Sequence, residues 1–341
     1  MKKTIIWVAI LVFLIINTGC STTTQQDKVS KPAPPPSRLS TSSSVHLSLG
    51  NPSNADAINP NNYLIVKPQY ALSYNRDKGI PNWVSWQLNK SWIGSVDRSN
   101  DFRPDSSLPD GWYQVTGKEY RGSGYDRGHM TPSGDRTNSE ANNSATFLMT
   151  NMVPQSPDNN RDYWRELEEY GRDLVEQDNE LYIIAGSYGE IKKIGIGKRK
   201  VSVPARLYKI VAITKPGSGG KNIKQVIAID TPNREGKGDW EDFITTVDAI
   251  EKKTGYDFLS NVDKSVQDVI EARKYSAKDN SDRSKTTAKQ SKNCSPAYPG
   301  VCIPAPPPDL NCGDISYRNF KVLPPDPHNF DGNKDGVACK R

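Results

Sequence analysis

Long apolar runs, histidine and cysteine are all scarce in this chain of 341 residues. The N-terminal apolar run, Ile5 to Ile16, is shorter than the roughly 20 residues that a membrane-spanning helix needs, so an uncleaved anchor is disfavoured. The three histidines, His46, His129 and His328, are far apart in the sequence. The most distinctive stretch also has no cluster of histidines or carboxylates, so a metal centre with many protein ligands is not expected there.

The composition allows one large folded domain between polar segments. Apolar residues make up 35% of the chain, which is enough for a core only if the polar stretches remain unpacked. Residues 21–60 are rich in Ser, Thr, Pro and Asn and are predicted to be a disordered tether, in which His46 is a solvated bystander. Residues 276–293 are charged and without periodicity, which predicts a second linker. The folded domain is therefore expected at 61–275, and the net charge of +6 is compatible with a polyanionic partner without proving one.

Residues 1–20 are typical of an export signal. Lys2 and Lys3 precede the apolar run, and Thr18-Gly19-Cys20 follows it. Small residues before a cysteine resemble a bacterial lipoprotein signal, in which Cys20 would be acylated and would attach the chain to a membrane. Asn17 stands where such signals usually have leucine, so a plain cleaved signal is the alternative. In both cases we expect an extracytoplasmic protein, either a membrane-anchored lipoprotein or a secreted or periplasmic protein.

Residues 294–341 form a small segment rich in cysteine and proline. Its cysteines are Cys294, Cys302, Cys312 and Cys339. An even number of cysteines in an exported segment predicts two disulfides, with three alternative pairings. A zinc site is the rival interpretation, which the wide and irregular spacing disfavours. A module of this size is below the length that folds well without such staples, and His328 within it is expected to be structural.

Residue patterns in the central region predict both strands and helices. Segments rich in β-branched and aromatic residues predict strands at Tyr63–Val66, Tyr70–Tyr74, Trp83–Leu88, Phe147–Met152, Leu181–Ala185, Arg206–Ile213 and Val226–Ile229. Helical spacing of apolar residues predicts a helix at Tyr163–Val175. Two further helices are predicted after the last strand, one with an apolar stripe from Trp240 to Ile250 and one with a stripe from Val262 to Ile270.

The most distinctive stretch runs from Tyr125 to Arg172 and starts with Tyr-Asp-Arg-Gly-His-Met. Hydrolysis of nucleic acid needs a base for water, positive charge for the transition state, and usually a metal at the leaving oxygen. His129 suits the base, because an imidazole with a pKa near ~6.5 is competent around neutrality. Arg127 offers a planar donor fork that matches phosphate oxygens.

The metal-binding part of this stretch is predicted to use few protein ligands. Mg²⁺ keeps several waters, so one amide oxygen from Asn160 together with hydration is a workable site. Glu168 lies on roughly the same side of the predicted helix, and Arg172 is expected to pair with it. Each residue also has a simpler interpretation: His129 as a surface residue, Asn159-Asn160 as a helix cap, and Glu168–Arg172 as a solvated ion pair.

The same stretch resembles the DNA/RNA non-specific endonucleases, the ββα-metal nucleases with an Asp-Arg-Gly-His signature. The signature at 126–129 is followed by Thr-Asn-Met-Val-Pro-Gln at 150–155 and then by Asn160, Trp164, Leu167-Glu168 and Arg172, close to the family's spacing. The resemblance covers roughly Asn62 to Asp257. It implies an α+β fold with a central antiparallel sheet and cleavage of both DNA and RNA that leaves 5′-phosphates.

The resemblance also implies a role for each residue that meets the water or the metal. His129 would deprotonate the attacking water. Asn160 would be the direct protein ligand of a hydrated Mg²⁺, with Mn²⁺ as the alternative ion. Glu168 would hold metal-bound waters.

The remaining matched residues would contact or orient the substrate. Arg127 and Arg172 would contact phosphate, and Asn151 would help to orient the site. An upstream arginine also belongs to the family's site. Arg98 fits its description best, with Arg103 as the second choice.

The C-terminal segment resembles the excalibur modules, small extracellular calcium-binding domains with a D-x-D-x-D-G-x-x-C pattern. Asp331, Asn333 and Asp335 alternate like the first three ligands of an EF-hand loop, which implies that they bind Ca²⁺. The segment departs from the pattern because Asn333 replaces an acidic residue and Lys340 stands where such modules often have Glu. A disulfide-stapled module that binds a wall or surface is therefore the alternative.

Together these features predict an exported, Mg²⁺-dependent endonuclease of DNA and RNA with an accessory C-terminal module. The rival from a different class is a surface lipoprotein that captures nucleic acid without cleaving it. Such a protein needs the arginines but not His129, Asn160 or Glu168, so the presence of all three favours the enzyme. Nothing in the sequence decides the oligomeric state.

Overall fold

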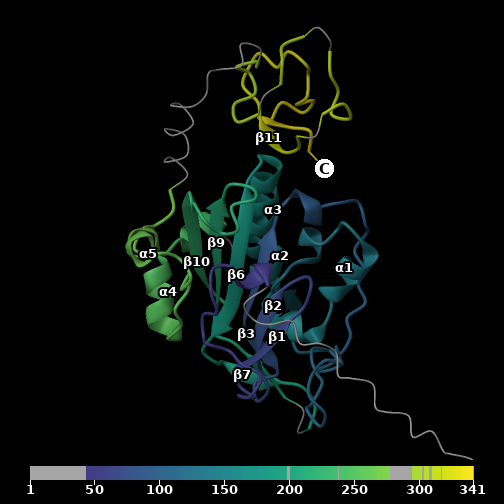
Figure 1. Cartoon of the computed structure of the whole chain (residues 1–341). Coiled ribbons are helices and arrows are strands. Elements are labelled where there is room, and N and C mark those ends of the chain that lie inside the picture. Colours follow the sequence, from purple (N-terminus) through teal and green to yellow (C-terminus); the bar gives the residue numbers. More distant parts are fainter. Residues whose placement is uncertain are drawn as a thin grey trace, which may run out of the picture. The chain divides into compact units, whose positions relative to one another are not determined.

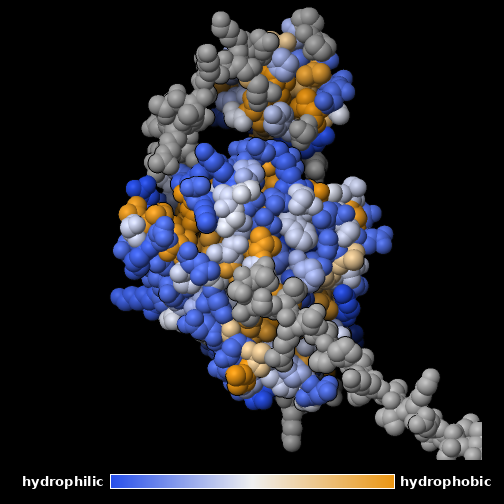
Figure 2. Space-filling view, viewed as in Figure 1, coloured by the Kyte–Doolittle hydropathy of each residue, from blue (hydrophilic) through white to orange (hydrophobic). Residues whose placement is uncertain are grey.

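The computed structural model describes residues 44–197, 200–236, 238–276, 294–301, 303–306, 309–315 and 317–340. The predicted export signal with Cys20 and nearly all of the predicted second linker lie outside these ranges. Within the ranges, no helix combines the length and the apolar character that a membrane crossing requires. The visible face of the molecule is mainly hydrophilic (Figure 2).

A six-stranded sheet forms the centre of the large domain (Figure 1). Its strands, in spatial order, are β1 (Tyr63–Val66), β2 (Ala71–Asn75), β3 (Ile80–Leu88), β6 (Glu180–Tyr188), β9 (Arg206–Thr214) and β10 (Gln225–Pro232). Every neighbouring pair is antiparallel. Six of the seven predicted strands are therefore found in one sheet, and the prediction of a central antiparallel sheet is confirmed.

The sheet separates two hydrophobic cores because successive side chains point to opposite faces. Along β6, Ile183 lies in the first core and the adjacent Ile184 in the second. Helix α3 (Tyr163–Glu176) packs on the first face, and it confirms the helix predicted there. Helices α4 (Val247–Thr254) and α5 (Lys264–Glu271) cover the second face. Figure 1 shows the sheet between these two layers.

Several shorter elements complete the large domain. They are the 3-10 helices η2 (Val45–Leu47), η3 (Lys90–Trp92), η4 (Ser133–Asp135), η5 (Met149–Asn151) and η6 (Trp240–Phe243), the helices α1 (Glu140–Ala145) and α2 (Pro157–Arg161), and the strand pairs β4 (Asp126–His129) with β5 (Met152–Gln155) and β7 (Lys192–Ile194) with β8 (Val201–Val203). The long segments between them carry little regular structure.

The strand predicted at Phe147–Met152 is wrong. Half of this run, Met149–Asn151, forms η5, and the strand β5 begins only at Met152. The Phe147 carbonyl accepts a hydrogen bond from the Arg103 backbone N–H, and the Met149 N–H donates to the Arg103 carbonyl. A short buried run of this kind has the same apolar pattern whether it is a strand or a buried turn, so sequence periodicity could not distinguish them.

The single helix predicted around the stripe from Trp240 to Ile250 is divided into η6 and α4. Between them, the Thr245 backbone N–H donates to the Ala228 carbonyl, which holds this short segment beside the sheet edge at β10. Thr246 then caps α4, because its hydroxyl accepts a hydrogen bond from the Ala249 N–H.

Residues 44–60 belong to the folded domain, so the prediction of a tether is wrong for this part of 21–60. Leu47, Leu49 and Ala55 are buried in the second core. The composition was misleading because only a few apolar side chains are needed to fix such a segment against an existing core. Residues 21–43 lie outside the described ranges.

His46 is also not the solvated bystander that was predicted. Its Nε2 donates to the Pro68 carbonyl at 2.8 Å, and its Nδ1 accepts a hydrogen bond from the Gln87 backbone N–H at 3.2 Å. These two partners define a neutral imidazole, because a carbonyl can only accept and an N–H can only donate. Burial, followed by the nearby Arg136 charge, lowers the pKa of His46 to about 4 against the opposing effect of the Pro68 hydrogen bond.

The C-terminal module has a small core of its own. Strands β11 (Phe320–Lys321) and β12 (Val337–Ala338) pair antiparallel beside Tyr298 and Phe330. The prediction of a disulfide-rich module is confirmed by the bond between Cys312 and Cys339. Cys294 is disulfide-bonded as well, and Cys302 lies outside the described residues.

His328 is structural, as predicted. It is buried, and its Nε2 donates to the Pro304 carbonyl at 2.7 Å. Its ring stacks on Tyr298 with 5.9 Å between the ring centroids. These contacts connect two distant parts of the module.

Candidate active site

The β4–β5 pair and the helices after it bring the distinctive residues together. In the antiparallel register, His129 lies opposite Met152 and Asp126 lies opposite Gln155. Gly128 is required by this close approach, because a Cβ at that position would lie 2.7 Å from the Gln155 Cβ. Helix α2 follows β5 almost at once, so it carries Asn160 back towards the start of β4. The sequence motif is therefore one structural unit of two strands followed by helices.

His129 is enclosed by two aromatic rings. Its ring centroid is 5.5 Å from that of Phe102 and 4.8 Å from that of Phe147, both in edge-on contact. Only 7% of the residue is exposed. Its Nε2 is buried, and no residue in the described part of the chain forms a hydrogen bond with it. The surface interpretation of His129 is therefore wrong, and its role as the base stays a prediction.

Two arginines lie over the same aromatic rings. The Arg127 guanidinium is 3.8 Å from the Phe102 ring centroid, and the Arg98 guanidinium is 4.9 Å from that of Phe147. Burial, together with the charges of Arg98 and Arg127, lowers the pKa of His129 to about 3. The imidazole is therefore neutral around pH 7 and keeps one nitrogen lone pair available.

The choice between Arg98 and Arg103 is resolved by their contacts. Arg98 Nη1 donates to Ser133 Oγ at 2.7 Å, and its charge acts on both His129 and Glu168. Arg103 instead binds the Asp101 carboxylate and the Ser144 carbonyl. These contacts favour Arg98 over Arg103, which braces a neighbouring loop, and the role of Arg98 stays a prediction.

Asn160 has an orientation that suits a cation ligand. Its Nδ2 donates to Asp126 Oδ2 at 2.9 Å, and a carboxylate can only accept from the amide nitrogen. The amide oxygen is therefore turned away from Asp126, and no group in the described ranges donates a hydrogen bond to it. Arg161 holds the Asp126 carboxylate with two further hydrogen bonds, at 2.8 and 2.7 Å. Asn160 lies inside α2 and does not cap a helix, so that simpler interpretation is wrong.

The predicted pair between Glu168 and Arg172 is replaced by two other ion pairs. Glu168 Oε1 is 3.1 Å from Lys209 Nζ, and Arg172 Nη1 is 3.0 Å from Asp135 Oδ1. Lys209 and Asp135 are almost fully buried, and each provides a closer partner than the neighbour on the same helix. Burial raises the pKa of Glu168, and the charges of Lys209 and Arg172 oppose that effect.

Asn151 holds the backbone between the two strands of the motif. Its Nδ2 donates to the carbonyls of Thr131 and Thr146, and its Oδ1 accepts from the Thr131 N–H at 3.0 Å. The side chain is fully buried. It can therefore orient β4 and His129, but it is not positioned to contact a substrate.

A cavity of about 800 Å³ opens beside some of these residues, whereas His129, Asn151, Glu168 and Arg172 are not among those that line it. Arg98, Arg127 and Asn160 line it, together with the cations Lys118 and Arg121 and the aromatic residues Phe102, Tyr120 and Tyr125. Four basic side chains around one cavity suit a polyanionic ligand, and aromatic rings suit bases that can stack.

The sequence analysis missed four supporting residues: Asp126, Asp135, Lys209 and Phe102. Lys209 carried a signal, because it is a lone charge within the apolar strand Arg206–Thr214. A buried charge needs a partner, so an acidic residue facing it could have been expected. The partners of the other three cannot be deduced from spacing.

Comparison with known proteins agrees with the geometry of the site. Residues 50–265 match the family of DNA/RNA non-specific endonucleases. The chain is 52% identical over 273 residues to a protein named nuclease from Nostoc sp., across 78% of this chain and 96% of that protein. It is 33% identical over 211 residues to human mitochondrial nuclease EXOG, across 58% of this chain and 56% of EXOG.

A solved structure supports the same conclusion. The crystal structure of the EndoG/EndoGI complex matches with a TM-score of 0.55 and 26% identity, over 64% of this chain and 91% of the matched chain. The fold and site are thus those of an endonuclease that acts on nucleic acid. The chain belongs to the DNA/RNA non-specific endonuclease family.

The loop predicted to bind Ca²⁺ is held by its own hydrogen bonds. Asp331 accepts from the backbone N–H groups of Asp335 and Gly336. Asp335 accepts from the Asn333 amide and forms an ion pair with Lys340. Asp331 is therefore oriented by the loop as a ligand would be, but Lys340 competes for Asp335. Binding of Ca²⁺ here stays a prediction.

Proposed function

We propose that the protein is an exported, Mg²⁺-dependent endonuclease that cleaves DNA and RNA to 5′-phosphate products. The observation that carries the proposal is the buried, neutral imidazole of His129, with a nitrogen that lacks a hydrogen-bond partner in the described structure. A catalytic base needs a free lone pair, and leaving one buried without a use is unfavourable. A protein that only captured nucleic acid would have no need for this arrangement.

In this proposal, His129 takes a proton from water as the water oxygen attacks the phosphorus. Protonation places a positive charge on the ring, next to Arg98 and Arg127. The cost is offset when the substrate phosphate brings its negative charge to the same place. Asn151 keeps the imidazole oriented through the backbone that it binds.

Asn160 would hold the ion through its amide oxygen, with Mn²⁺ as the alternative to Mg²⁺. One protein oxygen is compatible with Mg²⁺, which keeps most of its waters. When bound, the ion would supply positive charge at the leaving 3′ oxygen. Asp126 keeps the amide oxygen turned outward, and Glu168 would accept hydrogen bonds from waters of the ion.

The basic side chains at the cavity would position the substrate. Arg127 and Arg98 would contact phosphate oxygens, and Lys118 and Arg121 lie further along the cavity wall. Arg172 is turned to Asp135 and would act on phosphate at longer range or after rearrangement. Contacts to phosphate carry no sequence information, which fits an enzyme that does not select by base or sugar.

The test is cleavage of supercoiled plasmid and of total RNA, with Mg²⁺ and with chelator. The His129→Ala variant should lose several orders of magnitude in rate on both substrates, since it lacks the base. Its thermal unfolding should show that the fold is retained. Near-normal turnover by the variant would refute the base assignment, and binding without cleavage across several divalent ions would favour nucleic-acid capture.

Export, membrane attachment through Cys20 and Ca²⁺ binding by the C-terminal module complete the proposal. Support for the first two comes from the sequence pattern of residues 1–20. Support for Ca²⁺ comes from the Asp331 loop, in which a bound ion would displace Lys340 from Asp335. The chain would then act outside the cytoplasm, either tethered to a membrane or free.

A further inference from the structure

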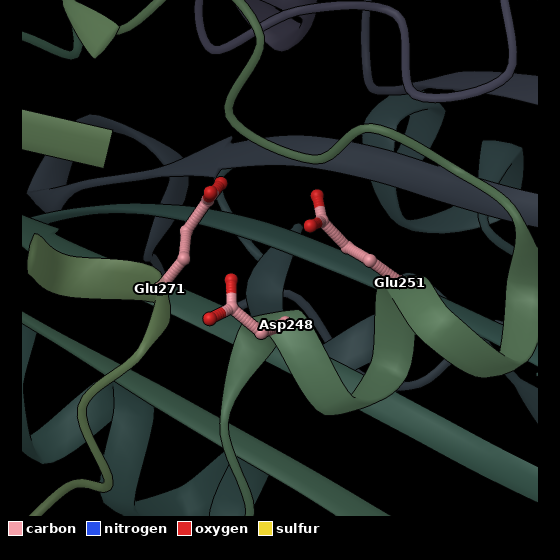
Figure 3. Close-up of side chains that lie close together, drawn as sticks. All are labelled: Asp248, Glu251 and Glu271. Atoms are coloured by element: carbon pink, nitrogen blue, oxygen red, sulfur yellow. The ribbon is translucent and has the colours of Figure 1, made fainter. Parts of the chain in front are cut away.

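A second group of acidic side chains lies on the opposite face of the sheet from α3. Asp248 is in the first turn of α4, Glu251 follows one turn later, and Glu271 ends α5. One carboxylate oxygen from each lies within 4.8 Å of the others. Figure 3 shows the three carboxylates converging on one space between the two helices.

Glu271 provides an independent indication that this space is meant for a ligand. The residue is only 3% exposed, and its Oε1 is buried with no hydrogen-bond partner in the part of the chain that the structure describes. Burying a carboxylate oxygen without a partner is costly unless something else satisfies it. Because one Glu271 carboxylate oxygen lies within 4.8 Å of those of Asp248 and Glu251, a ligand in the cluster could supply the missing partner.

The charges around Glu271 do not supply that partner. Burial and the negative charges of Glu251, Asp248 and Asp257 raise its pKa to about 8, although a hydrogen bond from Gln267 opposes them. Lys264, whose charge acts on Glu251, forms an exposed ion pair with Asp268. Around pH 7 the cluster therefore keeps Glu271 protonated beside the side chains of Asp248 and Glu251.

We propose that Asp248, Glu251 and Glu271 bind a hard divalent cation, Ca²⁺ in the first place, at a site separate from the catalytic centre. All three ligands offer oxygen, which suits Ca²⁺ and Mg²⁺ and not softer metals. Several protein carboxylates around one ion favour Ca²⁺, because Mg²⁺ keeps most of its waters.

The individual positions support this coordination. Glu251 Oε1 accepts a hydrogen bond from the Phe258 backbone N–H at 2.7 Å, which orients the side chain and leaves the other oxygen for the ion. Glu271 is buried, Glu251 is half-buried and Asp248 is exposed. The site is therefore open to solvent on one side, where waters can complete the shell of six to eight oxygens.

The bound ion would join α4 to α5, the two helices that cover the second core. Val247 and Ile250 of α4 and Ile270 of α5 belong to that core. Binding to the folded state alone raises stability in proportion to the logarithm of the ion concentration. The site is thus a stabilising clamp and not a participant in cleavage.

The experiment measures the melting temperature of the full chain with Ca²⁺ and with chelator. The chain carries Asn160→Ala and Asp331→Asn, so that the other two proposed ion sites are silent. Ca²⁺ at well above its Kd should raise the melting temperature by about 5 °C, and NaCl of equal ionic strength should not. Isothermal titration of the same protein should give one Ca²⁺ per chain, and titration with Mg²⁺ should give weaker binding.

Glu271→Gln in that background should abolish the rise. In chelator above about pH 8 its melting temperature should equal or exceed that of the parent, because the uncompensated buried charge is gone. Asp268→Asn is the matched control, with the same loss of charge on the same helix and outside the cluster. It should keep the full Ca²⁺ response.

Two results would overturn the proposal. One is an equal Ca²⁺ response in Glu271→Gln and its parent, and the other is no Ca²⁺ response in the parent. If Glu271→Gln does not fold, the exposed position Asp248→Asn takes its place with the same expectation of a lost response. Plasmid cleavage by the otherwise unchanged Glu271→Gln chain should remain normal, which separates this site from the catalytic one.

Discussion

His129 is held in position without a hydrogen bond from any described side chain. The aromatic rings of Phe102 and Phe147 fix the plane of its imidazole. Arg127 and Arg98 lie over these rings, so they bring positive charge close to His129 without a hydrogen bond to its Nε2. Packing against the aromatic rings therefore orients this imidazole, a task that a hydrogen-bonded carboxylate performs for many catalytic histidines. The result is an imidazole that stays neutral in the free protein.

The orientation of Asn160 depends on Asp126, and this dependence can be tested. Asp126→Ala should let the amide rotate and should raise the Mg²⁺ concentration for half-maximal cleavage by about 10-fold or more. The rate at saturating Mg²⁺ should fall less than in Asn160→Ala. Arg161→Ala, which removes the exposed partner of Asp126, is the control and should change the Mg²⁺ requirement only slightly. An unchanged Mg²⁺ requirement in Asp126→Ala would contradict the positioning role.

The lowered pKa of His46 predicts that the folded state loses stability in acid. Its folded pKa of about 4 lies below its usual 6.5, so its contribution is present above about pH 6.5 and is lost as the pH falls towards 4. Protonation would place an N–H on Nδ1 against the Gln87 N–H. Wild type should therefore lose about 2–3 kcal/mol more between pH 7.5 and 4.5 than His46→Gln, which has no such titration. Urea unfolding at both pH values measures this difference, and parallel losses would contradict it.

At the level of single residues, the sequence predicted which positions would gather and not how they would pair. The motif placed His129, Arg127 and Asn160 in one unit because its residues are close in the chain. It gave the wrong partner for Glu168, since Lys209 comes from a strand 41 residues later. Only the packing of that strand under α3 brings the two together.

Among the structural elements, the β4–β5 pair sets the geometry of the site. Gly128→Ala would place a methyl group against the Gln155 side chain, whose Cβ would lie 2.7 Å away. The strands would have to separate, with a cost of about 1–3 kcal/mol. Since a shift of 1 Å at a reacting group can cost about 100-fold, cleavage should fall by at least about 10-fold.

The double variant Gly128→Ala, Gln155→Gly tests that explanation. Removing the Gln155 side chain makes room for the new methyl group, so stability should recover relative to Gly128→Ala alone. Chemical denaturation and plasmid cleavage are the measurements. If the losses of stability in the two single variants simply add in the double variant, the close approach of positions 128 and 155 is not the reason that position 128 is glycine.

The elements of the main sheet could be predicted, whereas the short elements around the site could not. Strands such as Arg206–Thr214 are long and apolar, and burial on both faces leaves a continuous signal. The 3-10 helix at Met149–Asn151 is set by backbone hydrogen bonds to Arg103, which lies outside any local pattern. The Pro157–Arg161 helix is too short to show a period.

At the scale of the whole molecule, the three cores define what can be removed. Among the residues that the structure describes, the core of the C-terminal module contains none before 297, and the two cores of the large domain contain none after 275. A chain that ends at residue 276 should therefore keep the nuclease fold and its cleavage rate. A large loss of rate or melting temperature on this truncation would contradict the separation.

Truncation at the N-terminal end should affect stability very differently at two start points. A chain that starts at residue 44 should be as stable as one that starts at residue 21. A chain that starts at 61, the predicted end of the tether, lacks Leu47, Leu49 and Ala55 of the second core. Loss of a buried leucine costs about 2–5 kcal/mol, so this chain should not fold stably. Circular dichroism and melting curves of the purified chains decide the matter.

The segment at 44–52 also determines when the domain can fold during synthesis of the chain. The Asn261 N–H donates to the Leu49 carbonyl, and the Asp257 N–H donates to the Pro52 carbonyl. Residues near the end of the domain therefore hold the segment at its start in place. Lys209, which balances Glu168 beneath the site, also appears only late in translation. A nascent chain that still lacks these later residues therefore contains the Asp-Arg-Gly-His motif without the contacts that hold the folded domain together. We expect such a chain to be harmless to the nucleic acids of the cell that makes it until synthesis of the domain is complete.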